Sequence, residues 1–435
     1  MNMKHLILSA AAILQGFQVL AQAPKINKEA QSDTLELPYS TKSVTNFSNV
    51  IGWSGNEKPI APEGFVVSKY ADGFQNPRWL YVLPNGDVLV AESNSHHSTL
   101  EKVGGTIIGA GKSNDLSNSA NRITLLRDTN KDGIPEVRDT FLTGLNQPFG
   151  MLVLGNWFYV ANTDALLRFP YKSGQTKITS KGEKVTDLPA NKHNRHWTRS
   201  LISNAAGTKL YIGVGSGSNV AENGIAEEAW KANIIEISPD GKNKRIYASG
   251  LRNPVGLAWA PGTNTLWAAV NERDELGDDL VPDYLTSVKD GGFYGWPYSY
   301  FGQHEDPRIK DADKRPDLVK KAIVPDVDLG SHTASLGLAF YTKKAFPEKY
   351  QNGAFIGQHG SWNRSVLSGY KVVFVPFKNG KPSGIPEDFL TGFISDLSKS
   401  EVHGRPVAVI VTPDGSLLVT DDVSNTIWKV SAVKK

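Results

Sequence analysis

The chain has 435 residues, and its 47 Lys and Arg side chains against 44 Asp and Glu give a formal net charge of +3. A hydrophobic fraction of 40% with 41 glycines is typical of a folded globular protein and excludes a disordered or fibrous chain. The balanced charge gives no reason to expect a nucleic-acid partner. The absence of cysteine excludes disulfides, thiolate metal sites, Fe–S clusters and an attached c-type haem.

The first 23 residues have the pattern of a secretory signal peptide. Lys4 and His5 precede an apolar run from Leu6 to Leu14, and small residues follow at Ala21 and Ala23. A transmembrane helix is the alternative, but the run is shorter than the ~20 apolar residues that a span needs. We therefore expect a periplasmic or secreted protein with no membrane span once the signal peptide is removed. Residues 24–60 are polar and aperiodic, and we interpret them as an N-terminal tail or linker.

A short apolar strand after a turn recurs along the rest of the chain. Six segments have this form: Pro84–Glu92, Gly155–Phe169, Ala205–Gly215, Pro261–Asn271, Gln351–Gly360 and Pro413–Asp422. A second, related phrase precedes each of them, and these phrases begin at Phe74, Leu145, Arg195, Leu251, Ala334 and His403. Each unit thus contains a phrase (a short motif), then a strand, a turn and further strands. This is the order of elements in a four-stranded propeller blade.

The six units predict an all-β fold, a six-bladed β-propeller with four-stranded blades, over residues 61–435. We expect the last blade, around Arg405–Val430, to be closed by a strand from near the start of the domain. The units are longer than a compact blade, so insertions are expected at Ser93–Asn121 and Gly302–Asp328. A pair of β-sandwiches would explain the strands but not the six phase-matched phrases.

The segment DTNKDGIPE has the spacing of a calcium-binding loop, including the glycine at its sixth position, Gly133. Its twelfth position carries Asp instead of the usual Glu, and strands instead of helices are expected on both sides. We predict a structural calcium loop between strands, with a polar turn as the alternative. The candidate ligands are Asp128, Asn130, Asp132, Glu136 and Asp139.

Polar residues gather in the six phrases and at the ends of the strands that follow them. In a propeller these positions surround one end of the central channel. Four histidines fall near them: His196, His332, His359 and His403. Arginines and amides fall there too: Gln147, Arg199, Arg252, Asn253, Asn363 and Arg364. Cations in a narrow funnel need an anion, and Arg suits a planar carboxylate, so the pattern predicts a site for a planar polyanion beside a neutral His. The alternative is that each Arg pairs with an acid on the rim.

An acidic stretch, Asn271–Asp279, leaves the fourth unit and precedes the segment Asp290–Tyr298. Hard cations bind carboxylate and carbonyl oxygens, so this stretch is a second candidate metal site. A solvated acidic loop is the alternative.

Several motifs together resemble those of a known family, from about Gly64 to the C-terminus. They read LNQPFGM, RHWTRSL, VGSGSN, GLRNPVGLAW, NERDELGDDLVPDYL, GGFYGWP, HTASLGLAFY, GSWNRS and GRPVAVIVTPDGSLLVTDD. The chain resembles the soluble, pyrroloquinoline quinone (PQQ)-dependent sugar dehydrogenases, in particular the sorbosone/aldose dehydrogenase branch. The resemblance implies a six-bladed propeller that binds PQQ and Ca²⁺ and oxidises C1 of an aldose or sugar aldehyde by hydride transfer to the quinone. It also implies a separate electron acceptor, such as a cytochrome or a quinone.

The resemblance implies roles for single residues. His196 matches the general base, and in the glucose-oxidising relatives an acid stands where this chain has Arg195. The cofactor-binding candidates, some from the axial pattern and others from the resemblance, are Gln147, Arg199, Asn219, Arg252, Asn253, Asn363, Arg364 and Lys371. The candidates for the calcium ion beside PQQ are Glu272, Asp274, Glu275, Asp279 and Tyr294.

Two other functions remain open from the sequence. A calcium-dependent propeller lactone hydrolase would use its metal to activate water and would need no quinone. A non-catalytic propeller would only bind a ligand or partner. Sugar-driven dye reduction that requires PQQ and calcium separates the dehydrogenase from both.

Overall fold

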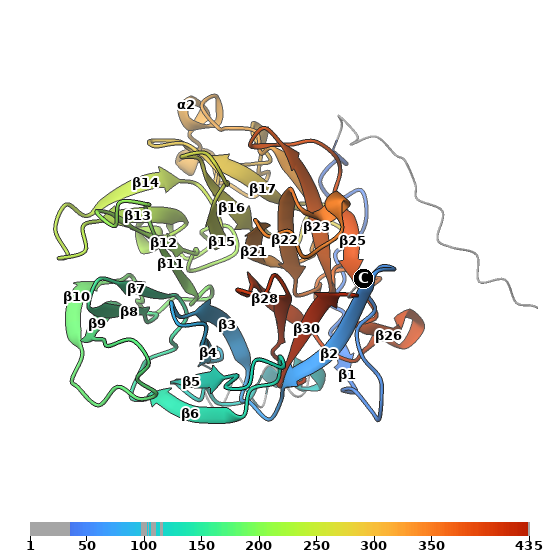
Figure 1. The fold of residues 1–435 in the computed structure, drawn as a ribbon. Helices are drawn as coiled ribbons and strands as arrows, with labels where there is room; N and C mark the ends of the chain where they lie inside the picture. The colour runs from blue at the N-terminus through green and yellow to red at the C-terminus, as the bar shows by residue number, and fades with distance from the viewer. Residues whose placement is uncertain (1–34, 97–101, 103, 106–109, 114–115, 434–435) are drawn as a thin grey trace, which may run out of the picture. The chain divides into compact units, whose positions relative to one another are not determined.

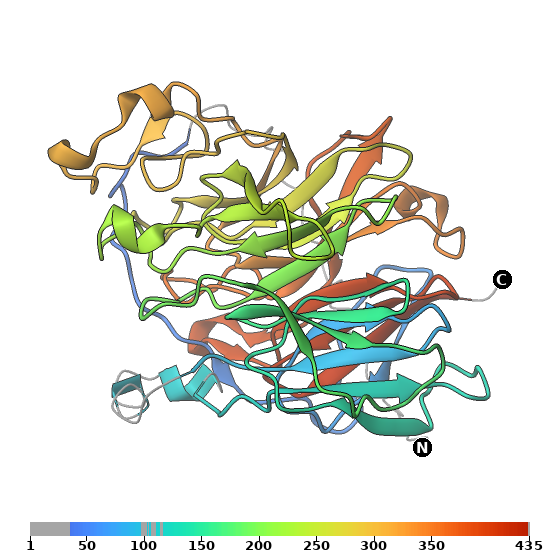
Figure 2. The same ribbon diagram turned by 90° about the vertical axis from the view of Figure 1, so that its left-hand side faces the viewer.

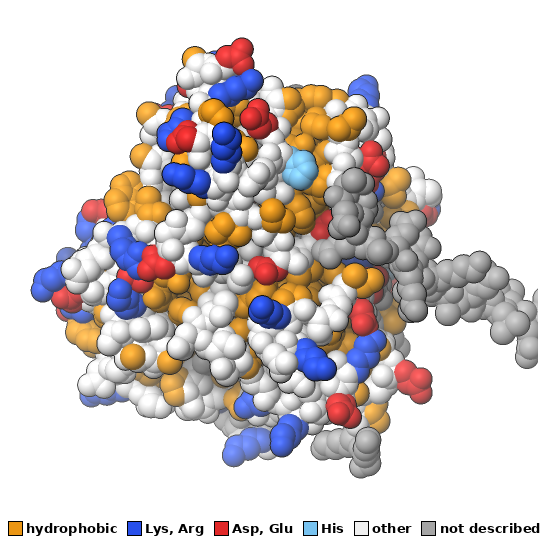
Figure 3. All heavy atoms as spheres, turned by 90° about the horizontal axis from the view of Figure 1, so that it is seen from above, with side chains coloured by type: hydrophobic (Ala, Val, Ile, Leu, Met, Phe, Trp, Pro, Cys, Tyr) orange, Lys and Arg blue, Asp and Glu red, His pale blue; other side chains and the backbone are white. Residues whose placement is uncertain are grey.

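A computed structural model describes residues 35–96, 102, 104–105, 110–113 and 116–433. The predicted signal peptide, the start of the predicted tail and part of the insertion at 93–121 lie outside these residues. None of the helices in the described part is long and apolar enough to cross a membrane. Figure 3 shows basic and acidic side chains interspersed over one face, in keeping with the small net charge.

Six antiparallel sheets of four or five strands make up most of residues 61–433 (Figure 1). The first is β3 (Pro77–Val82), β4 (Val88–Glu92), β5 (Arg122–Arg127) and β6 (Val137–Leu142). The second is β7 (Met151–Leu154), β8 (Trp157–Ala161), β9 (Ala165–Pro170) and β10 (Glu183–Asp187). The third is β11 (Arg199–Ser203), β12 (Leu210–Val214), β13 (Asn233–Ile237) and β14 (Arg245–Ser249).

The remaining three sheets are built in the same way. The fourth is β15 (Pro254–Trp259), β16 (Leu266–Val270), β17 (Pro282–Val288) and β20 (Val327–Ser331). The fifth is β21 (Ser335–Tyr341), β22 (Gly353–Gln358), β23 (Lys371–Lys378), β24 (Lys381–Pro382) and β25 (Glu387–Leu390). The sixth is β28 (Pro406–Val411), β29 (Leu417–Asp421), β30 (Thr426–Ala432) and β2 (Phe65–Ala71).

The predicted strands are confirmed in type and order. The six apolar segments each contain the second strand of a sheet, and the phrases before them form or precede the first strands. The predicted closing strand is β2, which pairs antiparallel with β30 so that Phe65 lies opposite Ala432.

Short elements occupy the connections. Two small sheets are formed by β1 (Asn49–Val50), β26 (Ile394–Asp396) and β27 (Glu401–Val402), and by β18 (Ser299–Tyr300) and β19 (His304–Glu305). The described helices are short: η1 (Ala110–Ser113), η2 (Ile225–Glu228), η3 (Asp311–Asp313), α2 (Pro316–Val319), η4 (Glu348–Tyr350) and η5 (Leu397–Lys399). The insertion expected at 302–328 carries β19, η3 and α2.

The first strands of the sheets contact one another in a cycle, in the order β3, β7, β11, β15, β21, β28 and back to β3 (Figure 1). Gly256 in β15 permits this close approach, because a Cβ there would lie 2.6 Å from the carbonyl oxygen of Leu336. Apolar side chains from all six sheets, or from the residues just before them, fill the centre: Trp79, Phe149, Trp197, Val255, Leu336 and Val407. This all-β arrangement of antiparallel sheets is consistent with a β-propeller.

The described part of the N-terminal segment, interpreted above as a tail or linker, is attached to the sheets. β1 pairs in parallel with β27, and the Trp53 indole donates a hydrogen bond to Asp421 at 2.8 Å. Further upstream, the Tyr39 amide donates to the Leu276 carbonyl at 2.7 Å, and the Gly277 amide donates to Ser43 Oγ at 3.1 Å. Figure 2 shows this dark blue segment running along the ends of the sheets.

Candidate active site

His196 lies in the loop that leads into β11, against the end of β12. The backbone amides of Arg195 and His196 donate to the carbonyls of Gly217 and Ser216, at 3.2 and 3.3 Å. The imidazole Nδ1 is 2.8 Å from the Ser216 carbonyl oxygen. Because a carbonyl oxygen only accepts hydrogen bonds, Nδ1 carries the hydrogen in this contact, and Nε2 keeps its lone pair.

The surroundings of His196 keep its imidazole neutral. Burial, followed by the positive charges of Arg252 and Arg195, holds its pKa well below the ordinary value of 6.5. A neutral imidazole with an unshared Nε2 can accept a proton, which is the property that a general base requires.

Arg252 is fully buried beside His196 and is held mainly by neutral oxygens. Its guanidinium donates to Asn219 Oδ1 at 2.9 Å and to the Glu272 carbonyl at 2.6 Å, while Asp274 is 3.6 Å away. Burial lowers the pKa of Arg252 to about 10, so the group stays charged at neutral pH. Its hydrogen bonds therefore go to neutral oxygens, and Asp274 is its ion-pair partner among the described residues.

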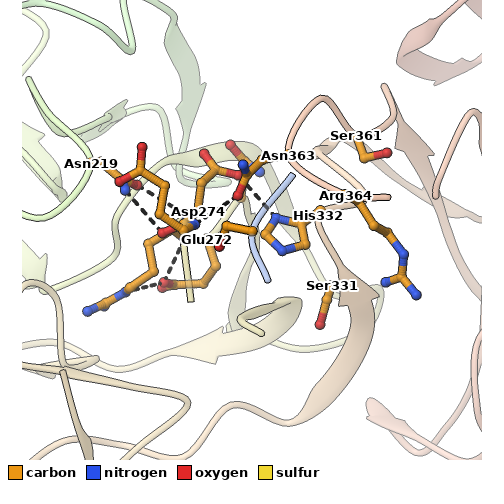
Figure 4. A network of polar contacts seen from close by, with 12 residues as sticks. Asn219, Glu272, Asp274, Ser331, His332, Ser361, Asn363 and Arg364 are labelled. Carbon is orange, nitrogen blue, oxygen red and sulfur yellow. Dashed lines mark hydrogen bonds and ion pairs between the residues drawn. The ribbon is translucent and has the colours of Figure 1, made fainter. Parts of the chain in front are cut away.

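Asp274 forms a hydrogen-bonded pair with His332 (Figure 4). His332 Nδ1 donates to Asp274 at 3.1 Å and Nε2 donates to the Gly277 carbonyl at 2.8 Å, so both ring nitrogens carry hydrogen. Burial alone would lower the pKa of His332, but the hydrogen bond and charge of Asp274 outweigh it and raise the pKa. In this state His332 is a cation that binds the acidic loop, and it has no free lone pair to act as a base.

The acids of the 272–279 loop do not gather around one point. Glu272 pairs with Arg273 at 2.9 Å, Asp279 pairs with Arg364 at 2.8 Å, and Glu275 is exposed. Tyr294 was expected beside the calcium ion, but this expectation is corrected. Its hydroxyl donates to the Ser287 carbonyl at 2.6 Å. Glu272 pairs with its sequence neighbour, whereas the partner of Asp279 lies 85 positions away and could not be predicted from spacing.

Glu272 Oε1 and Asn253 Oδ1 are among the buried oxygens that have no hydrogen-bond partner among the described residues. A buried oxygen without a donor is costly unless a cation or ligand group satisfies it. Carboxylate and amide oxygens are the ligands that calcium prefers, so each of these two oxygens is of a kind that binds a hard cation.

The remaining predicted cofactor residues have protein partners. The buried guanidinium of Arg199 donates to the carbonyls of Pro189, His196 and Thr198 and to Asn194, so it supports the His196 loop. Arg364 points away from the Asp274 cluster (Figure 4). Lys371 pairs with Asp388 at 2.6 Å, on β25.

The amide residues are held in the loops around the site. Gln147 Nε2 donates to the Asn94 carbonyl at 2.8 Å. Asn363 Oδ1 accepts from the Glu275 amide at 2.9 Å, which ties the loop after β22 to the acidic loop.

A buried charged group beside the centre was not predicted. Asp422 accepts hydrogen bonds from His359 Nε2, at 2.9 Å, and from Arg78. Arg78 also lies over the Trp197 ring, 5.6 Å from its centroid. Burial and then Arg405 lower the pKa of His359 to about 4. Arg78 of the first phrase and the two Asp residues that end the segment Pro413–Asp422 were visible in the sequence, but nothing indicated that they meet.

The predicted calcium loop brings three of its acids together. Ligand oxygens of Asp128, Asp132 and Glu136 lie within 4.8 Å of one another. One buried oxygen of Asp128 has no partner, which suits a cation. Asn130 donates to Asp132 at 3.0 Å. Asp139 is not in this group, because it lies in β6 opposite Leu125, and its expected place in the ligand set is corrected.

A family model described as glucose/sorbosone dehydrogenase matches residues 159–429. The chain belongs to this family. An uncharacterized protein of Borreliella burgdorferi is 32% identical to this family member over 305 residues, 67% of this chain and 77% of the other. An aldose sugar dehydrogenase of Escherichia coli is 31% identical over 197 residues, 45% of this chain and 46% of the other.

Solved structures share the fold of this glucose/sorbosone dehydrogenase family member. The holo PQQ domain of pyranose dehydrogenase from Coprinopsis cinerea has a TM-score of 0.67 at 18% identity, covering 88% of this chain and 100% of that one. A calcium structure of a Trichoderma reesei carbohydrate-active enzyme of family AA12 has a TM-score of 0.70 at 17% identity, covering 90% and 99%.

Proposed function

We propose that the protein is a PQQ-dependent dehydrogenase that oxidises an aldose or sugar aldehyde at C1 and passes the electrons to a separate acceptor. The observation that carries this proposal is the neutral His196, with its Nε2 unshared and its surroundings positively charged. The family membership supports sugar oxidation, and the fold neighbours include a PQQ-bound domain.

The positive charge around His196 fits an anionic cofactor. Arg199 and Arg252 are buried and held mainly by neutral oxygens, and Arg195 adds a third cation next to the base. A planar molecule with several carboxylates would be attracted to this region, while a neutral ligand would leave these charges uncompensated. Calcium beside the cofactor would use Glu272 Oε1 and Asn253 Oδ1, which are buried and have no hydrogen-bond partner among the described residues.

His196 carries the proton in the reaction that we propose. Its Nε2 accepts the proton of the sugar C1 hydroxyl, and its Nδ1 stays bound to Ser216, which holds the ring in place. The charges of Arg252 and Arg195 keep the base neutral before the reaction. Bound PQQ would supply the acceptor for the hydride from C1. A calcium ion would supply positive charge that stabilises the negative charge gained by the cofactor.

The finer architecture and location belong to the same proposal. We take the six sheets as the blades of a six-bladed propeller, with the polar phrases around one end of its channel. Export to the periplasm or the medium fits a quinoprotein of this kind, and the electron acceptor is a cytochrome or a quinone.

The Asp128–Glu136 loop is proposed as a separate, structural calcium site between β5 and β6. It lies at the opposite ends of the strands from His196, among turns such as Pro84–Asp87 and Thr412–Ser416 that line one groove with it. A cation there would stabilise the loop and take no part in the reaction.

Titration of the purified apoprotein with PQQ and Ca²⁺ tests the proposed function. We expect tight binding of PQQ, a change in its absorption spectrum, and dye reduction by aldoses only when PQQ is present. Lactone hydrolysis that ignores PQQ, or the absence of PQQ binding, would contradict the proposal.

A further inference from the structure

Arg195 stands beside the candidate base but has no acidic partner. Its side chain is exposed, and no carboxylate of the described residues forms an ion pair with it. The residue before His196 is therefore a cation at the open side of the site. Its backbone is held by the hydrogen bond to Gly217, so the position of the side chain is tied to that of His196.

The Arg195 guanidinium lies over the ring of Trp362, 5.7 Å from its centroid. Trp362 belongs to the loop after β22, on another sheet, and stacks on Phe47 at 5.9 Å with an interplanar angle of 16°. Asn46 strengthens this arrangement, because its amide donates to the Trp362 carbonyl at 2.8 Å. An arginine held on an aromatic face keeps its in-plane N–H donors free for a second partner.

The nearby acids form no ion pair with Arg195 and have other hydrogen-bond partners. Asp274 accepts from His332, and Glu222 accepts from the amides of Asn219 and Val220, at 3.1 and 2.8 Å. Both carboxylates interact electrostatically with Arg195, but neither forms an ion pair with it. Arg199 and Arg252 are buried and donate to carbonyl and amide oxygens of the protein, so Arg195 is the exposed cation of the three.

We propose that Arg195, held against Trp362, binds a carboxylate of the ligand that occupies the site. This inference rests on the proposed function for the identity of that ligand. The carboxylate belongs either to the cofactor or to an acidic sugar such as a uronate, whose ring Trp362 would contact. The chemistry is the same in both cases, namely a planar anion facing the fork of a guanidinium.

Binding to the apoprotein, followed by tryptophan fluorescence and calorimetry, tests this inference. The variants are Arg195→Gln, which removes the charge, and Arg195→Lys, which keeps the charge but loses the fork. Arg168→Gln is the matched control, because Arg168, in β9, also lies over a tryptophan ring, that of Trp157 in β8. The probes are PQQ, D-glucuronate and its neutral counterpart D-glucose.

We expect Arg195→Gln to weaken the binding of one anionic probe by about tenfold to a hundredfold, since a hydrogen bond to a charged group has that effect. The affinity of Arg195→Lys for that probe should lie between those of the wild type and Arg195→Gln. The affinity of Arg168→Gln should match that of the wild type. Loss of PQQ affinity assigns the carboxylate to the cofactor, whereas loss of the preference for glucuronate over glucose assigns it to the sugar.

The inference is overturned if Arg195→Gln binds both anionic probes as tightly as the wild type, or if the wild type binds neither. Failure of the proposed function has a different signature. In that case the wild type does not bind PQQ but binds glucuronate in a manner that depends on Arg195.

Discussion

His196 donates its Nδ1 hydrogen to the backbone carbonyl of Ser216 at 2.8 Å. Ser216 is itself held, since its amide donates to the Arg252 carbonyl at 2.7 Å and its hydroxyl donates to the Ser218 carbonyl at 2.6 Å. A carbonyl orients the imidazole as a carboxylate would, but without a negative charge that would strongly favour the imidazolium. The acid that precedes this histidine in the glucose-oxidising relatives is therefore not needed to select the tautomer.

Replacing His196 with Gln should abolish most turnover and leave PQQ binding intact. Gln can still hydrogen-bond to Ser216 but cannot accept a proton at neutral pH, and general-base catalysis is typically worth about 10²–10⁴-fold in rate. Turnover at saturating PQQ checks this, with exposed His304→Gln as the control. Near wild-type turnover in His196→Gln, together with a dead His359→Gln, would move the base to His359.

The acid limb of the pH–rate profile should lie below pH 6.5. His196 is active when neutral, and burial with the charges of Arg252 and Arg195 lowers its pKa, so protonation begins only at a lower pH. Arg195→Gln removes one positive charge and should shift the limb upward. The pH dependence of kcat/KM, which reports groups of the enzyme before the sugar binds, measures both effects, and a wild-type limb above pH 6.5 would contradict the lowered pKa.

Asp422→Asn should destabilise the fold strongly. Asp422 is 1% exposed and pairs with His359 and Arg78, and removing one partner of a buried ion pair typically costs about 3–5 kcal/mol. Urea denaturation gives the free energy of unfolding for comparison. Asp317→Asn, which breaks an exposed pair with Arg315, should change it little. Equal effects of the two substitutions would show that the buried pair has no special role.

Asp132→Ala should remove the stabilisation that calcium confers and leave activity per folded molecule nearly unchanged. A cation that binds only the native state raises the melting temperature by mass action. Thermal scans with Ca²⁺ and with a chelator measure the difference. Asp139→Ala is the matched control, since Asp139 lies outside the group of gathered acids and should keep the calcium effect. A calcium-independent wild type would refute the site.

The order of strands was predictable because its signals are local. Alternating apolar residues that follow a turn with glycine specify a strand and its hairpin from local sequence, and three of the six units have Asn-Gly or Asp-Gly in that turn. The same holds for Asp128, Asp132 and Glu136, whose spacing within one loop is enough to bring their oxygens together. The six phrases also predicted that a strand from near the start of the domain closes the last sheet, and this strand is β2, paired with β30.

Tertiary structure decided which partners several charged residues have. Arg252, predicted as an anion ligand, donates to Asn219 and to the Glu272 carbonyl on other loops. Arg199, also predicted as an anion ligand, donates instead to carbonyls of the loop just before it. Arg78 and Asp422 meet although 344 positions separate them. Local spacing determines which strands form, whereas packing of the sheets around the centre determines which side chains face each other, and only the second decides that Arg195 keeps its donors free.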